Sequence, residues 1–166
     1  MDIELGNIEE TDIGVSKYDI IFAMSAFEHV EDWKKGIKNV FKALKPGGLL
    51  YFQSTNKFSF TSGECRFPFY GWLPNKWRYR LRVFRQGEDI MKLGIDFNQF
   101  TYARLRSFFK DIGFLKVLDL VELRDSETLY QPKAWKKIVL KACKKIKPLK
   151  HLVLCFVPTT DFVCIK

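Results

Sequence analysis

The chain has 166 residues and a mass of 19.6 kDa, and its 28 Lys and Arg side chains outnumber its 19 Asp and Glu side chains, which gives a formal charge of +9. This length suits one domain, and a hydrophobic content of 47% is too high for an intrinsically disordered chain. The longest apolar run, 152–157, is far shorter than the roughly 20 residues that a transmembrane helix needs. The acidic N-terminus also lacks the basic and apolar pattern of a secretory signal.

The four cysteines, Cys65, Cys143, Cys155 and Cys164, show no CxxC spacing and no nearby pair of histidines. This pattern argues against a zinc site and against a disulfide framework. We therefore expect no metal site, and reduced thiols in a cytoplasmic protein.

The charge is distributed unevenly along the chain. Residues 1–32 hold nine acids and one base and so carry −8, whereas the rest of the chain carries +17. Residues 128–160 contain eight lysines and no acid. Such a block indicates either a surface that meets an anionic partner or simply a solvated helix face.

The first half of the sequence predicts a strand, a helix and a second strand. Residues 18–24 form a run that is apolar except for Asp19 and shows no strict alternation, typical of a strand that is covered on both faces. Asp32 fits a helix N-cap, apolar residues at helical spacing follow it, and Pro-Gly-Gly at 46–48 ends the pattern. A second strand is expected over 49–54, parallel to the first and joined to it by a right-handed crossover.

The second half is less regular. Residues 56–93 show no periodicity, but they contain nine aromatic residues and five arginines, which makes a folded, functional segment more plausible than disorder. After them we expect a helix that is capped by Thr101 and stopped by Gly113, and a strand over 114–123. A basic helix over 133–147 is interrupted by Pro148, and a closing strand covers 161–165.

Several short motifs occur together in one order: Leu5-Gly6-Asn7-Ile8-Glu9, Tyr18-Asp19-Ile20-Ile21, Glu28-His29-Val30 and Leu44-Lys45-Pro46-Gly47-Gly48-Leu49-Leu50. This order resembles the C-terminal half of class I S-adenosylmethionine-dependent methyltransferases of the small-molecule "type 11" kind, and Thr101, Leu105, Phe108 and Gly113-Phe114 continue the match. The resemblance implies an α/β, Rossmann-like methyltransferase sheet, incomplete at its N-terminal side, with an antiparallel last strand. It also implies methyl transfer from the cofactor S-adenosylmethionine to a small-molecule or lipid-like acceptor.

One part of the family pattern is missing. The family grips its cofactor with a glycine-rich loop after the first strand and an acid after the second, and no GxGxG occurs in this sequence. We therefore expect residues 1–166 to be the C-terminal portion of a methyltransferase domain, with 56–93 as an insertion or lid. Two alternatives stay open: another chain supplies the missing half, or the protein does not bind the cofactor.

The resemblance assigns cofactor-binding roles to four residues. Asn7 falls where the family has an acid that reads the adenine amino group, and Ile8 falls where a backbone N–H meets the ring. Met24 and Ser25 follow the strand whose end faces the methionine part of the cofactor, at the edge where α/β sheets bind ligands. The structural alternatives are a turn asparagine, a core methionine and a capping serine.

Glu28 and His29 are the candidate catalytic pair. A histidine titrates near neutral pH and can take a proton from a substrate hydroxyl. Because methyl transfer depends chiefly on alignment, a structural histidine is the alternative.

The 56–93 segment supplies the predicted acceptor pocket, with Asn56, Trp72, Arg78 and Arg80 as substrate-binding residues. Aromatic rings form apolar walls, and arginines bind carboxylate or phosphate groups. The hypothesis is an acceptor with a large apolar portion and an anionic group. The alternative is a lid that only packs on the domain.

The basic helix over 133–147 has lysines on one side and a stripe that contains Trp135 on the other. Such a helix suits an anionic membrane surface, but packing of the stripe on the sheet is the commoner arrangement and our expectation. The alternative functions are a non-catalytic methyltransferase-like remnant or partner-binding subunit, and a basic module that binds RNA or a membrane, with nucleic acid the less favoured partner. An open sheet edge also predicts self-association.

Overall fold

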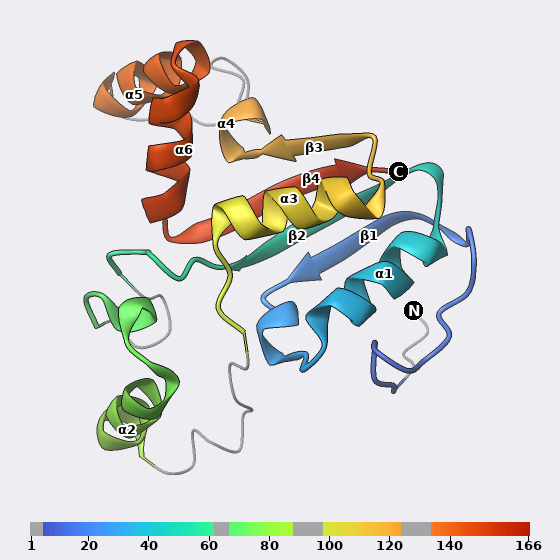
Figure 1. Cartoon of the computed structure of the whole chain (residues 1–166), viewed down its shortest axis with the longest axis horizontal. Coiled ribbons are helices and arrows are strands. Elements are labelled where there is room, and N and C mark those ends of the chain that lie inside the picture. Colours follow the sequence, from blue (N-terminus) through green and yellow to red (C-terminus); the bar gives the residue numbers. More distant parts are fainter. Residues whose placement is uncertain (1–4, 62–66, 88–97, 124–133) are drawn as a thin grey trace.

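The structure is a computed structural model that describes residues 5–61, 67–87, 98–123 and 134–166 (Figure 1). Its strands are β1 (Tyr18–Met24), β2 (Leu44–Thr55), β3 (Lys116–Asp119) and β4 (Thr159–Ile165). Its α-helices are α1 (Trp33–Ala43), α2 (Asn75–Gln86), α3 (Tyr102–Ile112), α4 (Leu120–Leu123), α5 (Ala134–Lys145) and α6 (Lys147–Phe156). Two short 3₁₀ helices, η1 (Phe27–His29) and η2 (Tyr70–Trp72), complete the described elements.

The four strands form one mixed sheet in the order β1-β2-β4-β3. β1 and β2 are parallel and are joined through α1, whereas β4 runs antiparallel to both of its neighbours. The predicted α/β class and the antiparallel last strand are therefore confirmed. β1 lies at one edge of the described sheet, and the strand ends that carry Met24 and Thr55 meet at one side of the molecule (Figure 1).

Helices α1 and α3 lie side by side on one face of the sheet (Figure 1). Leu50 and Phe52 alternate along β2 toward this face and are fully buried there, together with Ile37 of α1 and Phe109 of α3. The rings of Phe52 and Phe109 lie 5.3 Å apart in an edge-on arrangement, which is the favoured geometry for buried aromatic pairs. This apolar layer is the core that fixes β1 and β2 in place.

The Pro46-Gly47-Gly48 segment lies inside β2 rather than between the helix and the strand. Helix α1 ends at Ala43, and the pairing with β1 shifts register after Tyr18. Gly47 has a φ of +76°, and a Cβ atom on Gly48 would lie 2.8 Å from the carbonyl oxygen of Lys45. Glycine at both positions therefore allows a bulge that other residues would resist.

The structure corrects the expectations for the second half of the chain. Part of the segment predicted without periodicity is helical, as η2 and α2. The strand expected over 114–123 ends at Asp119, because its Oδ1 atom accepts the backbone N–H groups of Val121 and Glu122, both at 3.1 Å, and so starts α4. Pro148 does not end a helix but stands in the first turn of α6, where proline is tolerated.

The apolar stripe of the basic helix is not packed on the sheet, so the expectation of packing is wrong. Trp135 and Ile138 of α5 are 59% and 69% exposed, whereas Cys143 is buried. The outward face of β1 is open as well, with Ile20, Phe22 and Met24 all more than half exposed. In the part of the chain that the structure describes, no helix has the length and apolar character needed to cross a membrane.

Candidate functional site at the carboxyl edge of the sheet

Ligands of open α/β sheets bind at the carboxyl ends of parallel strands, so the ends of β1 and β2 are the first place to look for a site. The backbone N–H of Ser25 donates to the carbonyl oxygen of Gln53 at 3.0 Å, which joins the two strand ends. Ser25 has a φ of +48°, a left-handed conformation that few residues other than glycine adopt. Met24 and Ser25 are both exposed here, as their predicted cofactor-binding role requires.

Glu28 and His29 follow this turn but lie in different environments. Glu28 is fully buried, and its Oε2 atom accepts a hydrogen bond from Ser54 Oγ at 2.8 Å. Its Oε1 atom has no hydrogen-bond partner among the described residues. His29 is exposed. Of the predicted catalytic pair, only His29 is therefore accessible to an acceptor. Glu28 instead holds the end of β2 through its hydrogen bond with Ser54.

A second polar group lies on the other face of the same edge. Asp161 of β4, only 7% exposed, accepts hydrogen bonds from Gln53 Nε2 at 2.9 Å and from Tyr51 Oη at 3.2 Å. Its other oxygen accepts from Thr159 Oγ1 at 2.6 Å. No local sequence pattern predicts this cluster, although Asp161 is the only acid after Glu127 and precedes the apolar residues 162–165.

Asn56 continues β2 beyond this edge, but its side chain is engaged inside the protein. Its Nδ2 atom donates to the carbonyl oxygens of Leu154, Cys155 and Val157 at 3.0–3.1 Å, and the residue is 4% exposed. These bonds attach the end of β2 to the end of α6. The amide hydrogens of Asn56 are used in this way, so the geometry gives it a positioning role beside its predicted substrate role.

The two predicted arginines of α2 do not form one anion clamp. Arg78 is 3% exposed, donates to Asn75 Oδ1 at 2.9 Å and lies 5.7 Å from the centre of the Tyr70 ring. Arg80 is exposed and lies 5.8 Å from the ring centre of Trp77. An anionic group that approaches α2 from solvent therefore meets Arg80, whereas Arg78 holds the segment together.

Trp72 belongs to a surface group of rings that we call the aromatic cluster: Phe60, Phe69, Trp72 and Phe156. Phe60 stacks on Phe156 of α6 with 5.1 Å between ring centres and 11° between planes. Trp72 stacks on Phe156 at 6.2 Å and meets Phe69 edge-on at 5.6 Å. Phe60, Phe69 and Trp72 remain 44–50% exposed, so the cluster forms an open apolar wall next to the end of β2.

Asn7 and Ile8 lie in the segment that precedes β1. Asn7 Oδ1 accepts the backbone N–H of Glu9 at 3.0 Å, which is a turn interaction. The carbonyl oxygen of Ile8 accepts from Asn39 Nδ2 of α1 at 2.9 Å. These contacts show that Asn7 stabilises a turn and that the backbone of Ile8 is attached to α1. The cofactor-binding roles of both residues stay predictions.

A buried ionic network lies at the carboxyl end of β3. Asp119 Oδ2 accepts from Tyr102 Oη at 2.8 Å, from Arg106 at 2.6 Å and from Lys150 at 2.9 Å, and Lys150 also reaches Glu122 at 2.8 Å. Burial raises the pKa of Asp119, but hydrogen bonds from Lys150 and Tyr102 outweigh burial and leave the pKa below its usual value. Burial and the Asp119 carboxylate raise the pKa of Tyr102. Two acids and two bases balance here, as in a structural clamp that holds α3, α4 and α6 to the sheet.

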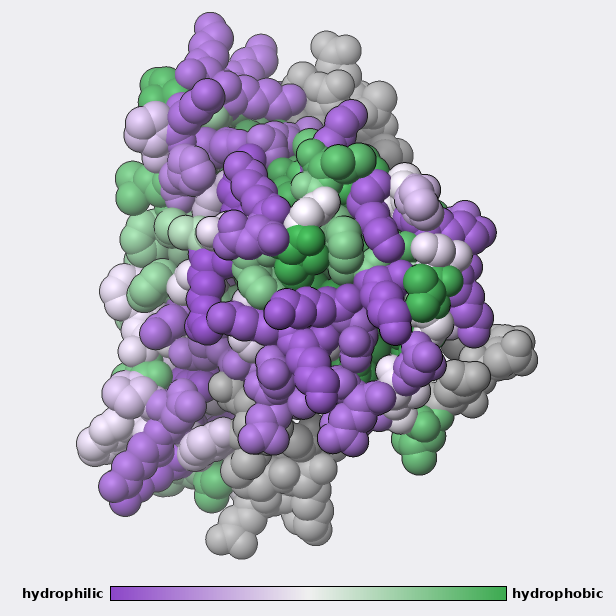
Figure 2. Space-filling model, turned by 45° about the vertical axis from the view of Figure 1, so that its right-hand side comes forward, coloured by the Kyte–Doolittle hydropathy of each residue, from purple (hydrophilic) through white to green (hydrophobic). Residues whose placement is uncertain are grey.

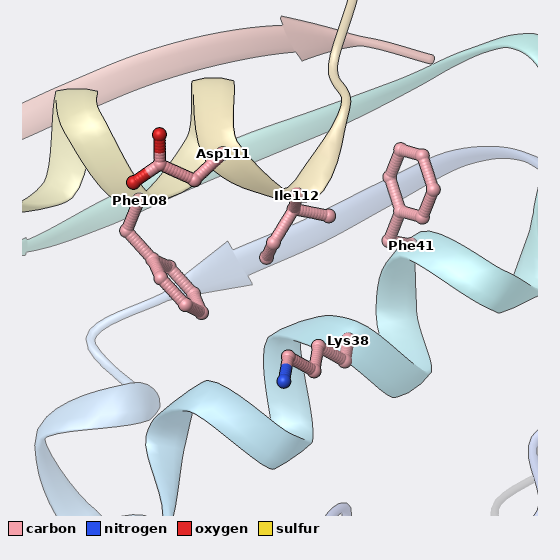
Figure 3. Close-up of a pocket in the computed structure, with 5 residues that line it drawn as sticks. All are labelled: Lys38, Phe41, Phe108, Asp111 and Ile112. Carbon is pink, nitrogen blue, oxygen red and sulfur yellow. The ribbon is translucent and has the colours of Figure 1, made fainter.

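A hollow of about 450 Å³ lies elsewhere, between α1 and α3 (Figure 3). Its lining residues are Lys38, Phe41, Phe108, Asp111 and Ile112. It opens on the helix-covered side of the molecule, away from the carboxyl ends of β1 and β2, and includes no predicted site residue. In residues 5–61, 67–87, 98–123 and 134–166, no group of three or more His, Cys, Asp or Glu side chains could hold a metal ion.

Comparison with known families shows which family has this fold. A family model described as a methyltransferase domain matches residues 5–123. The chain belongs to the methyltransferase-domain family. This domain implies S-adenosylmethionine as the cofactor. The matched range spans β1, α1 and β2 and therefore contains the joined ends of β1 and β2, whereas Asp161 and Phe156 of the candidate site lie beyond it.

Solved structures share the fold. An S-adenosylmethionine-dependent methyltransferase from Mesorhizobium loti has a TM-score of 0.54 and 14% identity, over 98% of this chain and 68% of its own. One from Archaeoglobus fulgidus has a TM-score of 0.51 and 13% identity, over 99% of this chain and 66% of its own. Phosphoethanolamine N-methyltransferase 2 from Haemonchus contortus, in complex with S-adenosylmethionine, has a TM-score of 0.50 and 16% identity, over 96% and 35%. The present chain thus spans between about a third and about two thirds of these proteins, and no curated protein sequence matches it.

Proposed function

We propose that this methyltransferase domain takes part in S-adenosylmethionine-dependent methyl transfer to a small-molecule or lipid-like acceptor, and that it forms the acceptor side of the site. The observation that carries the proposal is the family match over 5–123, which contains the joined ends of β1 and β2. The exposed Met24, Ser25 and His29 lie at or just after the end of β1.

The residues at this edge fit one flank of the cofactor. Met24 offers a thioether, Ser25 a hydroxyl and Gln53 an amide at adjoining positions. A glycine-rich loop, which would let backbone approach the cofactor closely, does not occur in these 166 residues. We propose that a further segment or a second chain, paired along the open edge of β1, supplies the other flank.

The acceptor side favours an amphiphilic molecule. The aromatic cluster offers half-exposed rings as an apolar wall, and Arg80 offers an exposed cation on α2. When bound, S-adenosylmethionine supplies an electrophilic methyl group, and the contribution of this chain is to orient the acceptor. In this proposal His29, which is exposed, takes the proton from an acceptor hydroxyl.

Calorimetric titration of S-adenosylmethionine tests the cofactor part of the proposal. The titration is run on this chain and on any longer form that its gene encodes, with S-adenosylhomocysteine as the competing ligand. We expect saturable binding wherever the second flank is present, and weaker binding without it. Failure of every form to bind either ligand would contradict the proposed activity.

Arg80 provides the test of acceptor class. With an active form, Arg80→Ala should raise KM for an acceptor with an anionic group by roughly tenfold, the value of one charge-assisted contact. A neutral analogue of the same acceptor is the control, and its KM should not change. Equal effects on both acceptors would remove the anionic group from the proposal.

A second candidate function rests on the open face of β1. Ile20, Phe22 and Met24 are 54%, 69% and 56% exposed in a row along one strand, as in a surface that binds another chain. In this alternative the domain is a non-catalytic, partner-binding subunit. The same calorimetry separates the two functions, because this subunit would bind its partner and not the cofactor.

A further inference from the structure

Helix α5 exposes a continuous apolar stripe, which we call the α5 stripe: Trp135, Ile138, Val139 and Ile146. With 3.6 residues per turn, Trp135, Ile138 and Val139 fall on one side of the helix, and Ile146 follows directly after its last residue, Lys145. Their exposed fractions are 59%, 69%, 37% and 51%. Cys143, one turn after Val139, is buried, and Leu140 packs against the core, so α5 meets the protein along one margin of the stripe while Trp135 and Ile138 stay in solvent.

Exposed lysines run along one margin of the stripe. Lys141 and Lys145 lie next to Ile138 around the helix, and Lys137 lies one row further, all of them exposed. Residues 134–160 include no acidic residue, so this surface carries one sign of charge. Lys150 is not part of it, because Asp119 and Glu122 neutralise its charge inside the protein.

We propose that α5 docks on an anionic lipid bilayer, with the α5 stripe at the boundary of the acyl chains and the lysines against the headgroup phosphates. A helix with an apolar stripe, a tryptophan and a lysine border has the composition of helices that lie in the membrane interface. Lysine stems lie along apolar surface and keep their ammonium groups in water, which suits this border. The position of α5 at the outer end of the molecule allows a flat surface to approach it (Figure 1).

The side chains of the stripe favour a bilayer over RNA. Proteins that bind single-stranded RNA stack bases on aromatic rings and combine them with a basic groove. Three of the four stripe residues are aliphatic, and aliphatic side chains provide no ring for stacking. Branched aliphatic residues beside one tryptophan instead match the hydrocarbon boundary of a membrane.

Helix α6 connects this surface to the candidate site. It begins at Lys147, directly after the stripe, and ends at Phe156, which stacks on Phe60 in the aromatic cluster. A docked α5 therefore holds the apolar wall of the acceptor side near the lipid. Bilayer binding itself does not depend on the proposed methyl transfer, since it involves neither cofactor nor acceptor.

Vesicle sedimentation of the full chain without cofactor tests the inference. Vesicles of phosphatidylcholine with phosphatidylserine should bind the protein, and vesicles of phosphatidylcholine alone should bind it much less. Lys137→Glu with Lys141→Glu should lower the partition coefficient by at least about tenfold, because each lysine near an anionic surface contributes measurably to binding. The matched control is Lys35→Glu with Lys42→Glu on the exposed side of α1, which should leave the coefficient unchanged.

Two tryptophans with equal exposure give the apolar test. Trp135 and Trp77 are both 59% exposed, on α5 and α2 respectively. Trp135→Ala should lower vesicle binding and Trp77→Ala should not, and circular dichroism confirms that both variants are folded. The inference is overturned if neutral and anionic vesicles bind equally, if either control matches its test variant, or if the chain binds polyuridylate RNA but no vesicle.

Discussion

Glu28 and Asp119 are both fully buried carboxylates, but their surroundings differ. Asp119 accepts from Tyr102 and lies in ion pairs with Arg106 and Lys150. Glu28 accepts from Ser54 Oγ at 2.8 Å, and its Oε1 atom has no hydrogen-bond partner in the part of the chain that the structure describes. A buried charge is tolerated when it is paired and hydrogen-bonded. Asp119 is therefore a structural anchor, whereas Glu28 retains unused acceptor capacity beside the candidate site.

This contrast predicts different costs for two isosteric changes. Asp119→Asn leaves Arg106 and Lys150 with Glu122 as their remaining acidic partner in this network, and we expect a loss of about 3 kcal/mol in the free energy of unfolding. Glu28→Gln removes no ion pair that the described residues form, and the change in the free energy of unfolding should be about 1 kcal/mol or less. Urea unfolding monitored by circular dichroism measures both. Similar losses in the two variants would contradict the structural assignment of Asp119.

The same anchor predicts a pH dependence. Burial raises the pKa of Asp119, but its hydrogen bonds lower this pKa by more than burial raises it, so the folded pKa lies below the unfolded value of about 4. The stabilisation is fully present above the unfolded pKa and is lost as the pH falls through the folded pKa. Below about pH 4, wild-type protein should lose stability more steeply than Asp119→Asn. Parallel curves of unfolding free energy against pH would exclude Asp119 as the source.

At the scale of elements, hydrophobic periodicity found the helices whose buried side is apolar. Helix α1 was predicted from Asp32 onward, and Asp32 does accept the N–H of Lys35 at 3.1 Å. Helix α2 was missed because Arg78 and Arg82, rather than apolar residues, are its buried positions. Helix α6 was missed because a proline usually marks the end of a helix, whereas Pro148 lies in the first turn of a new one. The pattern of α5 was found, but spacing alone does not reveal whether an apolar stripe meets a sheet or solvent.

The candidate site shows the same division between local and distant pairing. Met24 and Ser25 were predicted at the ligand edge because an apolar run of strand length ends there, and that inference needs only the local sequence. The Gln53–Asp161 contact arises from antiparallel pairing of β2 with β4, in which these two residues are opposite each other. No local pattern gives that register. Asn56 was assigned to substrate for a similar reason, since its partners on α6 are about a hundred residues further along the chain.

Asn56 is the junction between β2 and α6, and its replacement should weaken that junction. Asn56→Ala leaves the carbonyl oxygens of Leu154, Cys155 and Val157 without their shared donor, at an expected cost of about 2 kcal/mol. Thermal unfolding checks the value. Asn7→Ala, at an exposed turn, is the matched control and should cost about 0.5 kcal/mol or less. Equal costs would show that the junction does not depend on Asn56.

At the scale of the whole molecule, the two faces of the sheet are treated differently. The face under α1 and α3 is closed, and Figure 2 shows mostly hydrophilic side chains on the outside of that half, with hydrophobic ones between them. The opposite face of β1 presents Phe22 at 69% exposure, with its ring 6.0 Å from that of Tyr51. Isolated exposed apolar residues are common on proteins, but a row along an edge strand is a site for pairing.

The open strand therefore predicts self-association when the chain is studied without another partner. Apolar side chains on β1 favour pairing with a second copy, as does its outer edge, which pairs with no strand among the described residues. Sedimentation velocity should show a species larger than the monomer, and its fraction should rise with protein concentration. Phe22→Lys places a charge on this strand and should return the protein to the monomer. Leu115→Lys is the control, because Leu115 is 80% exposed but lies outside β1, in the turn before β3. A wild-type chain that stays monomeric at every concentration, or a control that abolishes association equally well, would show that β1 is not the contact.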